Sequence, residues 1–133
     1  MVFLTRECAD GNYTDFYSYI TRLVGQNSRR GALMLTMDVR HPDISKFATM
    51  KADKNKVTGA NISVKLNNDF LNAVIKDEEY EQCWPIENPK INKKVKAKEV
   101  WNTIIKSATT TADPGLLFWD NIFILSFQVE RSS

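Results

Sequence analysis

The sequence contains few of the residues that build redox or metal centres. Its 133 residues include two cysteines and one histidine. Cys8 and Cys83 are far apart and match neither a zinc-site spacing nor a vicinal dithiol, so we expect two reduced thiols and no metal site. His41 has no second imidazole or nucleophile pattern near it, and we expect it to form a hydrogen bond where a helix begins.

Long apolar segments and the common nucleotide-binding signatures are also missing. The longest apolar run near the end of the chain, residues 122–127, is far shorter than the roughly 20 residues of a membrane span. Residues 1–7 lack the apolar core and cleavage site of a secretory signal. No P-loop or dinucleotide fingerprint is present, and scattered aspartates nominate no acid–base pair. We expect a cytoplasmic protein with no membrane partner.

The composition is that of one soluble domain. Apolar residues make up 43% and charged residues 26% of the chain, and the mean hydropathy is -0.35. The net charge of +2 decides little. Lysines gather in residues 51–56 and 90–98, which would suit a local anionic partner, although such runs are more often a solvated edge or loop.

Apolar periodicity predicts alternating helices and short strands. Helices are expected over about residues 14–26, after His41-Pro42-Asp43, after Asn67 or Asn68, and over about residues 97–111. Continuous or alternating apolar runs predict strands at residues 32–37, 60–66 and 116–119. Residues 78–98, which contain two prolines, are expected to form an exposed hairpin or excursion.

The same spacing assigns side chains to the interior. In the first helix the expected apolar stripe consists of Phe16, Tyr17, Ile20, Leu23 and Val24, and Tyr19 and Trp101 are also expected in the core. In the second helix the stripe consists of Ile44, Phe47 and Met50, and in the third of Phe70, Leu71, Val74 and Ile75.

The order of elements predicts an α/β fold with about three parallel strands joined by helical crossovers. Three strands make a poor sheet by themselves, because a parallel sheet needs both faces covered. We therefore expect a segment of a larger sheet or barrel.

Two loops that run into predicted strands are the best candidates for a binding site. The first contains Gln26, Ser28, Arg29, Arg30 and Gly31, whose adjacent guanidinium groups suit a phosphate. The second contains Lys54, Lys56, Thr58, Gly59, Ala60 and Asn61, a set of donors and acceptors that suits a base or ribose. From composition alone, each loop is also explained as an ordinary surface turn.

Four longer phrases carry a resemblance to a known family. They are RRGALMLTMDVRHPDISKFATMKAD, KVTGANISVKLNNDFLNAV, KVKAKEVWNTIIKSA and DPGLLFWDNI, in this order between about Tyr13 and Ile122. Together they resemble an internal segment of the large catalytic subunit of ribonucleotide reductase, most closely the adenosylcobalamin-dependent class.

The resemblance implies a fold and a role for each loop. It implies that the strands belong to a ten-stranded reductase barrel and that residues 1–122 are a segment of it. Residues 26–31 would match a specificity loop that holds a deoxynucleoside triphosphate or ATP effector. Residues 54–61 would match a second loop between effector and substrate base. The helix after His41 would lie near a homodimer contact that completes the effector site.

The resemblance also limits the chemistry that we expect of the chain. Adenosylcobalamin, a thioredoxin-type reductant and the remaining reductase segments would be partners of the parent enzyme, with no direct role for nucleic acid. Cys8 and Cys83 do not lie in the family's cysteine motifs, so no catalytic residue is assigned. We expect residues 123–133 to be a tail that diverges from the family. Three readings stay open: a reductase fragment that needs complementation, a nucleotide-binding module without chemistry, and an inactive remnant.

Overall fold

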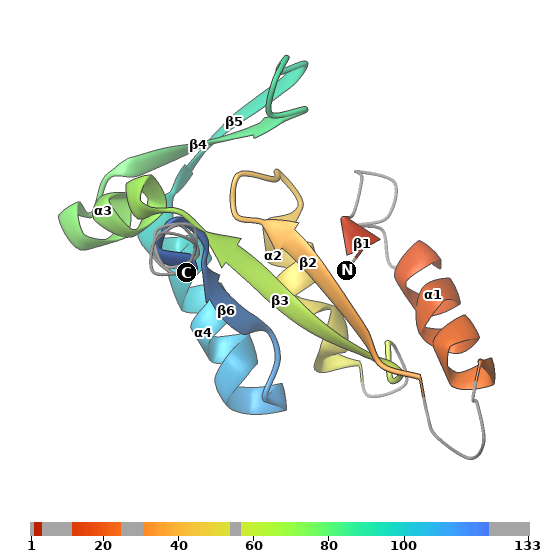
Figure 1. Ribbon diagram of the computed structural model, residues 1–133. Coiled ribbons are helices and arrows are strands. Elements are labelled where there is room, and N and C mark those ends of the chain that lie inside the picture. Colours follow the sequence, from red (N-terminus) through yellow and green to blue (C-terminus); the bar gives the residue numbers. More distant parts are fainter. Residues whose placement is uncertain (1, 4–11, 25–30, 54–56, 123–133) are drawn as a thin grey trace, which may run out of the picture.

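The computed structural model describes residues 2–3, 12–24, 31–53 and 57–122, and its centre is a parallel sheet (Figure 1). The strands are β1 (Val2–Phe3), β2 (Leu33–Asp38), β3 (Ala60–Leu66) and β6 (Gly115–Phe118), in the order β1-β2-β3-β6. Every neighbouring pair is parallel, which confirms the α/β class. The three predicted strands are present, and β1 adds a fourth that is too short to leave a periodic signal.

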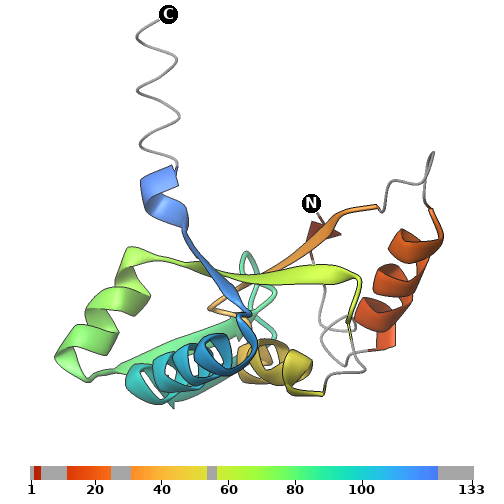
Figure 2. The same cartoon turned by 90° about the horizontal axis from the view of Figure 1, so that it is seen from below.

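Helices connect the strands and cover one face of the sheet (Figure 2). They are α1 (Asn12–Leu23), α2 (Ile44–Thr49), the 3-10 turn η2 (Met50–Ala52), α3 (Asn68–Lys76) and α4 (Ala97–Thr111). In Figure 2, α2, α3 and α4 lie below the sheet, and α1 stands at the end where β2 and β3 begin. Among the described residues the sheet is open, with β1 and β6 at its edges, so it does not form the closed ten-stranded barrel.

The hydrophobic core lies between the sheet and the helices. Successive strand residues point to opposite faces, and the register places Leu35 beside Ile62 on the covered face. These side chains are buried together with Ile44 and Phe47 of α2 and Ile104 of α4. The removal of this apolar surface from water is the main favourable term that holds the helices on the sheet.

The other face of the sheet carries several polar side chains, beside the apolar Met34 and Leu117. Thr36 lies beside Ser63 and Asp38 beside Lys65, and three of these four side chains are buried. The Lys65 ammonium stands 3.7 Å from the centre of the Trp119 ring. The helix-covered face carries apolar side chains, whereas the other face carries Asp38 and Lys65. A shift of register by one residue would therefore bury charge in the core.

Two local predictions are confirmed residue by residue. Asn67 caps α3, because its side-chain oxygen accepts a hydrogen bond of 2.9 Å from the Phe70 amide. Residues 78–98 contain an antiparallel hairpin of β4 (Glu79–Trp84) and β5 (Ile91–Lys96), which protrudes at the top of Figure 1. Its exposed Lys94 and Lys96 face Glu81 and Glu79, so the lysines form a solvated and partly balanced surface.

The predicted apolar stripe of the first helix is wrong. Phe16, Tyr19, Leu23 and Val24 are 57%, 56%, 65% and 61% exposed, and Tyr17 and Ile20 are 37% and 36% exposed. The buried side of α1 carries Thr14 and Ser18 instead. The reason is that α1 packs close to Gly31 of the first loop and on the second loop, where the Val57 and Gly59 amides need polar partners, and not on the apolar core.

Smaller corrections concern the bounds and one further side chain. The helix expected at 14–26 is Asn12–Leu23, the helix after His41 begins only at Ile44, and the last strand is Gly115–Phe118. Ile75 is 81% exposed, because Phe70 sets the inner face of α3 and Ala73 is the side chain that shares it. Trp101 does pack against the core. None of the described helices is long and apolar enough to cross a membrane.

Candidate functional site

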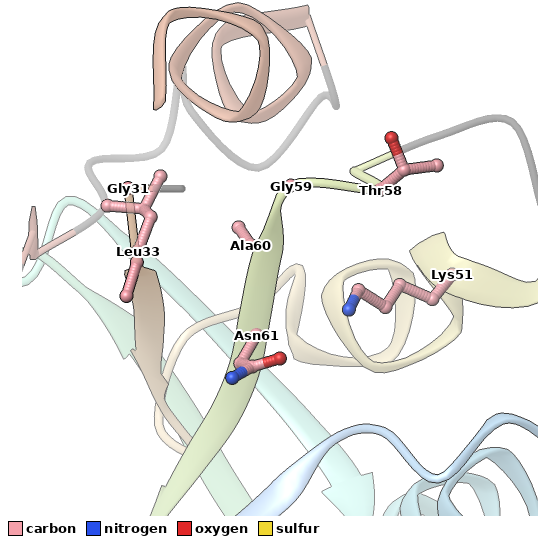
Figure 3. A pocket seen from close by; sticks show the side chains of 8 residues that line it. Gly31, Leu33, Lys51, Thr58, Gly59, Ala60 and Asn61 are labelled. Atoms are coloured by element: carbon pink, nitrogen blue, oxygen red, sulfur yellow. The ribbon is translucent and has the colours of Figure 1, made fainter. Parts of the chain in front are cut away.

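The two candidate loops enter the neighbouring strands β2 and β3 at the same end of the sheet. Because β2 and β3 are parallel and Leu33 lies beside Ala60, the described residues just before them, 31–32 and 57–59, are neighbours in space. Between them is a hollow of about 630 Å³, lined by Gly31, Ala32, Leu33, Lys51, Thr58, Gly59, Ala60 and Asn61 (Figure 3). The structure therefore brings the described parts of both loops to one site.

Five of the predicted site residues lie in this hollow: Gly31, Thr58, Gly59, Ala60 and Asn61. Thr58 and Asn61 are exposed and offer a hydroxyl and an amide, which can both donate and accept hydrogen bonds. The remaining predicted residues, Gln26, Ser28, Arg29, Arg30, Lys54 and Lys56, lie outside the part of the chain that the structure describes.

Gly31 is required by a close approach of the first loop to α1. A Cβ atom built on Gly31 would lie 2.6 Å from the backbone oxygen of Thr21 and 3.3 Å from that of Val24. Since a backbone oxygen cannot be displaced by a rotamer change, any larger residue would push the start of β2 away from α1. The glycine thus fixes where the first loop ends.

The second loop is held by side chains of α1. The Val57 amide donates a hydrogen bond of 2.7 Å to the Asp15 carboxylate, and the Gly59 amide donates one of 2.7 Å to the Ser18 hydroxyl. Val57 is 2% exposed and adopts a positive φ of 49°, which is unfavourable for a β-branched residue. The sequence did not indicate these contacts, because the partners are about forty residues apart.

Lys51 is a site residue that the sequence did not separate from its lysine-rich surroundings. Its ammonium lies 2.7 Å from the Asp113 carboxylate, and the two side chains are 15% and 18% exposed. The other Asp113 oxygen accepts a hydrogen bond of 3.4 Å from the Ile62 amide. In Figure 3 the Lys51 side chain extends toward β3. Because Asp113 neutralises it, Lys51 contributes shape to the hollow more than free positive charge.

A second hollow adjoins the first on the other side of the second loop. It has a volume of about 650 Å³ and is lined by Lys51, Val57, Thr58, Thr109, Thr110, Thr111, Ala112 and Asp113. Lys51 and Thr58 line both hollows. The described end of the second loop therefore separates two spaces, each large enough for part of a small ligand.

A charged cluster lies at the opposite ends of β2 and β3. The Arg40 guanidinium donates two hydrogen bonds to Asp38, of 3.0 Å and 2.9 Å, and this contact raises the pKa of Arg40. Burial lowers the pKa of Lys65, with the Asp38 charge acting in the opposite direction. Burial also raises the pKa of Tyr80. The cluster is internally paired and lies away from the hollows.

His41 forms the hydrogen bond expected of it. Its Nδ1 atom accepts a bond of 3.1 Å from the Asp43 amide just before α2, and the ring packs 4.8 Å from that of Trp84. His41 is 1% exposed. Among the described residues there is no group of three or more His, Cys, Asp or Glu side chains that could hold a metal ion.

Comparison with known proteins gives the family. Residues 13–128 match the model of the ribonucleotide reductase barrel domain, which is most of the chain. The chain belongs to the ribonucleotide reductase barrel-domain family. The resemblance drawn from the four sequence phrases is thereby confirmed.

Curated reductases extend the match. A vitamin B12-dependent ribonucleoside-diphosphate reductase of Thermoplasma acidophilum is 38% identical over 122 residues, which cover 89% of this chain. One of Mycobacterium tuberculosis strain CDC 1551 is 39% identical over 95 residues, or 71% of the chain. A vitamin B12-dependent ribonucleotide reductase of Rhodopirellula baltica is 29% identical over 118 residues, also 71% of the chain. The matched parts cover only 16%, 14% and 11% of these reductases.

Among the described residues of this reductase segment, neither His41 nor Cys83 is presented as a ligand for the cobalt of a corrinoid. The single histidine is buried against Trp84 and beside the start of α2, so its ring is not presented to a ligand on the surface. Cys83, in β4, is partly buried, and its amide donates a 2.8 Å hydrogen bond to the Arg40 carbonyl. Cys8 lies outside the described residues. No residue of the segment is assigned to cobalamin or to the radical chemistry.

Proposed function

We propose that this segment supplies the nucleotide-recognition loops of a vitamin B12-dependent ribonucleotide reductase. The observation that carries the proposal is the convergence of both loops on one hollow at the amino ends of β2 and β3. The family supplies the reaction class, reduction of ribonucleotides to deoxyribonucleotides, and the names of the relatives supply the cofactor. Its ligand would be a deoxynucleoside triphosphate or ATP acting as an effector.

The chemistry of the hollow supports this ligand. The exposed Asn61 amide and Thr58 hydroxyl suit a base or ribose, and Gly59 leaves room for close approach of a ligand to the backbone. Lys51 is neutralised by Asp113, so the charge that balances the phosphates is assigned to Arg29 and Arg30 of the first loop. Arginine suits this task, because its planar guanidinium can donate two parallel hydrogen bonds to a phosphate.

The position of the second loop supports communication between two ligands. Thr58 lines both hollows, so a base in one hollow and a base in the other would contact opposite sides of the same loop. An effector that favours one loop shape would then favour one substrate base, with a coupling of about 1 to 3 kcal/mol. Adenosylcobalamin, a thioredoxin-type reductant and the rest of the reductase would act in the parent enzyme.

A homodimer is also part of the proposal, with its contact now proposed on α1 instead of near α2, the helix after His41. One side of α1 is apolar and exposed and carries Phe16, Tyr19 and Leu23. Another side of the same helix holds the second loop beside the effector hollow. A second copy that covered these side chains would bury them and stand next to the first loop.

Isothermal titration calorimetry of the chain with a panel of deoxynucleoside triphosphates tests the proposal. We expect saturable binding that Arg29→Ala together with Arg30→Ala weakens by at least tenfold, because two phosphate contacts are lost. Unchanged affinity in that variant would refute the phosphate assignment. No binding at millimolar nucleotide would favour the inactive remnant.

Complementation separates the two remaining readings. The chain mixed with the rest of a reductase that lacks this segment should restore deoxynucleotide formation if it works as a reductase segment. Nucleotide binding without restored formation would favour a stand-alone nucleotide-binding module.

A further inference from the structure

Helix α1 contacts the described ends of both loops with one of its sides. Asp15, Ser18 and Thr21 follow each other at intervals of three residues, which places them along one side of the helix. Asp15 and Ser18 accept hydrogen bonds from the second loop, and the Thr21 backbone oxygen is the atom that excludes a Cβ from Gly31 of the first loop. The helix therefore lies against the described ends of both loops.

The two hydrogen bonds are placed where they control the second loop. They bind the amides of Val57 and Gly59, the residues on either side of Thr58. With both flanking amides held, the backbone that carries the Thr58 side chain, which lines both hollows, is held as well. The backbone of Val57 has a φ of 49°, a region that a β-branched residue rarely adopts unless contacts hold it there.

We propose that Asp15 and Ser18 are positioning residues that hold the second loop in its nucleotide-binding shape. This inference rests on the proposed function, since it assigns these residues to the same hollow. Neither side chain lines the hollow, so both act through the loop backbone. Loss of either acceptor leaves a loop amide to be satisfied in another way, and the loop then samples shapes in which Thr58 is misplaced.

Three variants of the full chain and two controls test the inference. The variants are Asp15→Ala, Asp15→Asn and Ser18→Ala, and the controls are Asp69→Ala and Ser45→Ala, which alter exposed residues of α3 and α2. The measurements are amide hydrogen exchange of Val57 and Gly59 without ligand, and the dissociation constants for a panel of deoxynucleoside triphosphates. Circular dichroism at the titration temperature identifies the folded variants that enter the comparison.

In the Asp15→Ala variant we expect the Val57 amide hydrogen to exchange faster with solvent. The variant should bind nucleotide about tenfold more weakly, which corresponds to the loss of one hydrogen bond to a charged group. Ser18→Ala should act in the same way on Gly59, with about threefold weaker binding. Asp15→Asn keeps an acceptor oxygen and should lie between the wild type and Asp15→Ala. The two controls should match the wild type in both measurements.

The possible outcomes separate this inference from the proposed function. Faster exchange in Asp15→Ala with wild-type dissociation constants would overturn the positioning role and leave nucleotide binding intact. Equal weakening by the controls would also overturn it. A wild-type chain that binds no nucleotide would overturn both proposals together.

Discussion

The ammonium of Lys51 lies 2.7 Å from the carboxylate of Asp113, a residue 62 positions further along the chain. This ion pair joins the turn after α2 to the turn before β6, and Lys51 lines both hollows while Asp113 lines the second. Both side chains are largely buried, so the pair is shielded from solvent more than an ordinary surface salt bridge. The pair links Lys51, which lines the first hollow, to strand β3, because Asp113 also accepts a hydrogen bond from the Ile62 amide.

We predict that Lys51 and Asp113 are energetically coupled. A double-mutant cycle with Lys51→Met and Asp113→Ala should give a coupling of about 1 to 2 kcal/mol in urea unfolding. Asp113→Ala should cost more than Lys51→Met, because it also removes the acceptor of the Ile62 amide. The exposed pair Lys98 and Asp77, at 3.5 Å, is the control and should couple by less than about 0.5 kcal/mol. Equal coupling in the two pairs would contradict the assignment.

The two glycines at strand starts should differ in their tolerance of a methyl group. Gly31→Ala should lower the free energy of unfolding by about 1 to 3 kcal/mol, because its Cβ would meet the Thr21 backbone oxygen at 2.6 Å. Gly115→Ala should cost less, since its nearest neighbour is the Ser63 hydroxyl at 3.0 Å, which can rotate. Chemical denaturation of both variants measures the difference, and a Gly31→Ala midpoint equal to that of the wild type would be inconsistent with this packing.

The exposed side of α1 should govern self-association. Leu23→Glu should weaken a dimer by at least tenfold in analytical ultracentrifugation, because the new carboxylate would lose its hydration at the contact. The matched control is Ile75→Glu on α3, which changes another highly exposed apolar residue and should leave association unchanged. Each variant should alter the free energy of unfolding by less than about 0.5 kcal/mol. A wild-type chain that stays monomeric at high concentration would refute the dimer.

Lys65 should lose its proton at lower pH than an ordinary lysine. Burial lowers its pKa below 10.5, so between the two values the unfolded chain binds more protons than the folded chain. The stability of the wild type relative to Lys65→Gln should therefore rise as the pH approaches 10.5. An NMR titration of the Lys65 side chain measures the pKa directly, and a midpoint at or above 10.5 would contradict the expected direction.

The sequence predicted those elements whose signals are local. β3 (Ala60–Leu66) and α4 (Ala97–Thr111) have the predicted bounds, and Asn67 is the cap of the two that were predicted, Asn67 or Asn68. In these segments the apolar period and the flanking polar residues lie within a few positions of each other. β1, with two residues, is too short to show a period.

The errors arose where the partner of a segment is distant in sequence. Periodicity identified two chemically different sides of α1 but not which side faces the protein, because that depends on the loop amides that α1 meets. The sequence did not distinguish Lys51 from the neighbouring lysines, because its partner Asp113 lies 62 positions further along the chain. Residues Thr58 to Asn61 of the candidate site were predicted correctly. They lie where β3 begins, and the start of a strand is a local feature of the sequence.

The location of nucleotide on the chain is the most direct test of the account. In two-dimensional NMR of the labelled chain titrated with deoxynucleoside triphosphate, the amide signals of Gly59, Ala60 and Asn61 should shift in proportion to saturation. Those of the distant hairpin, such as Lys93 and Lys94, should stay in place. Shifts confined to the hairpin, or no shifts at millimolar nucleotide, would contradict the claim that the hollow between β2 and β3 is a nucleotide site.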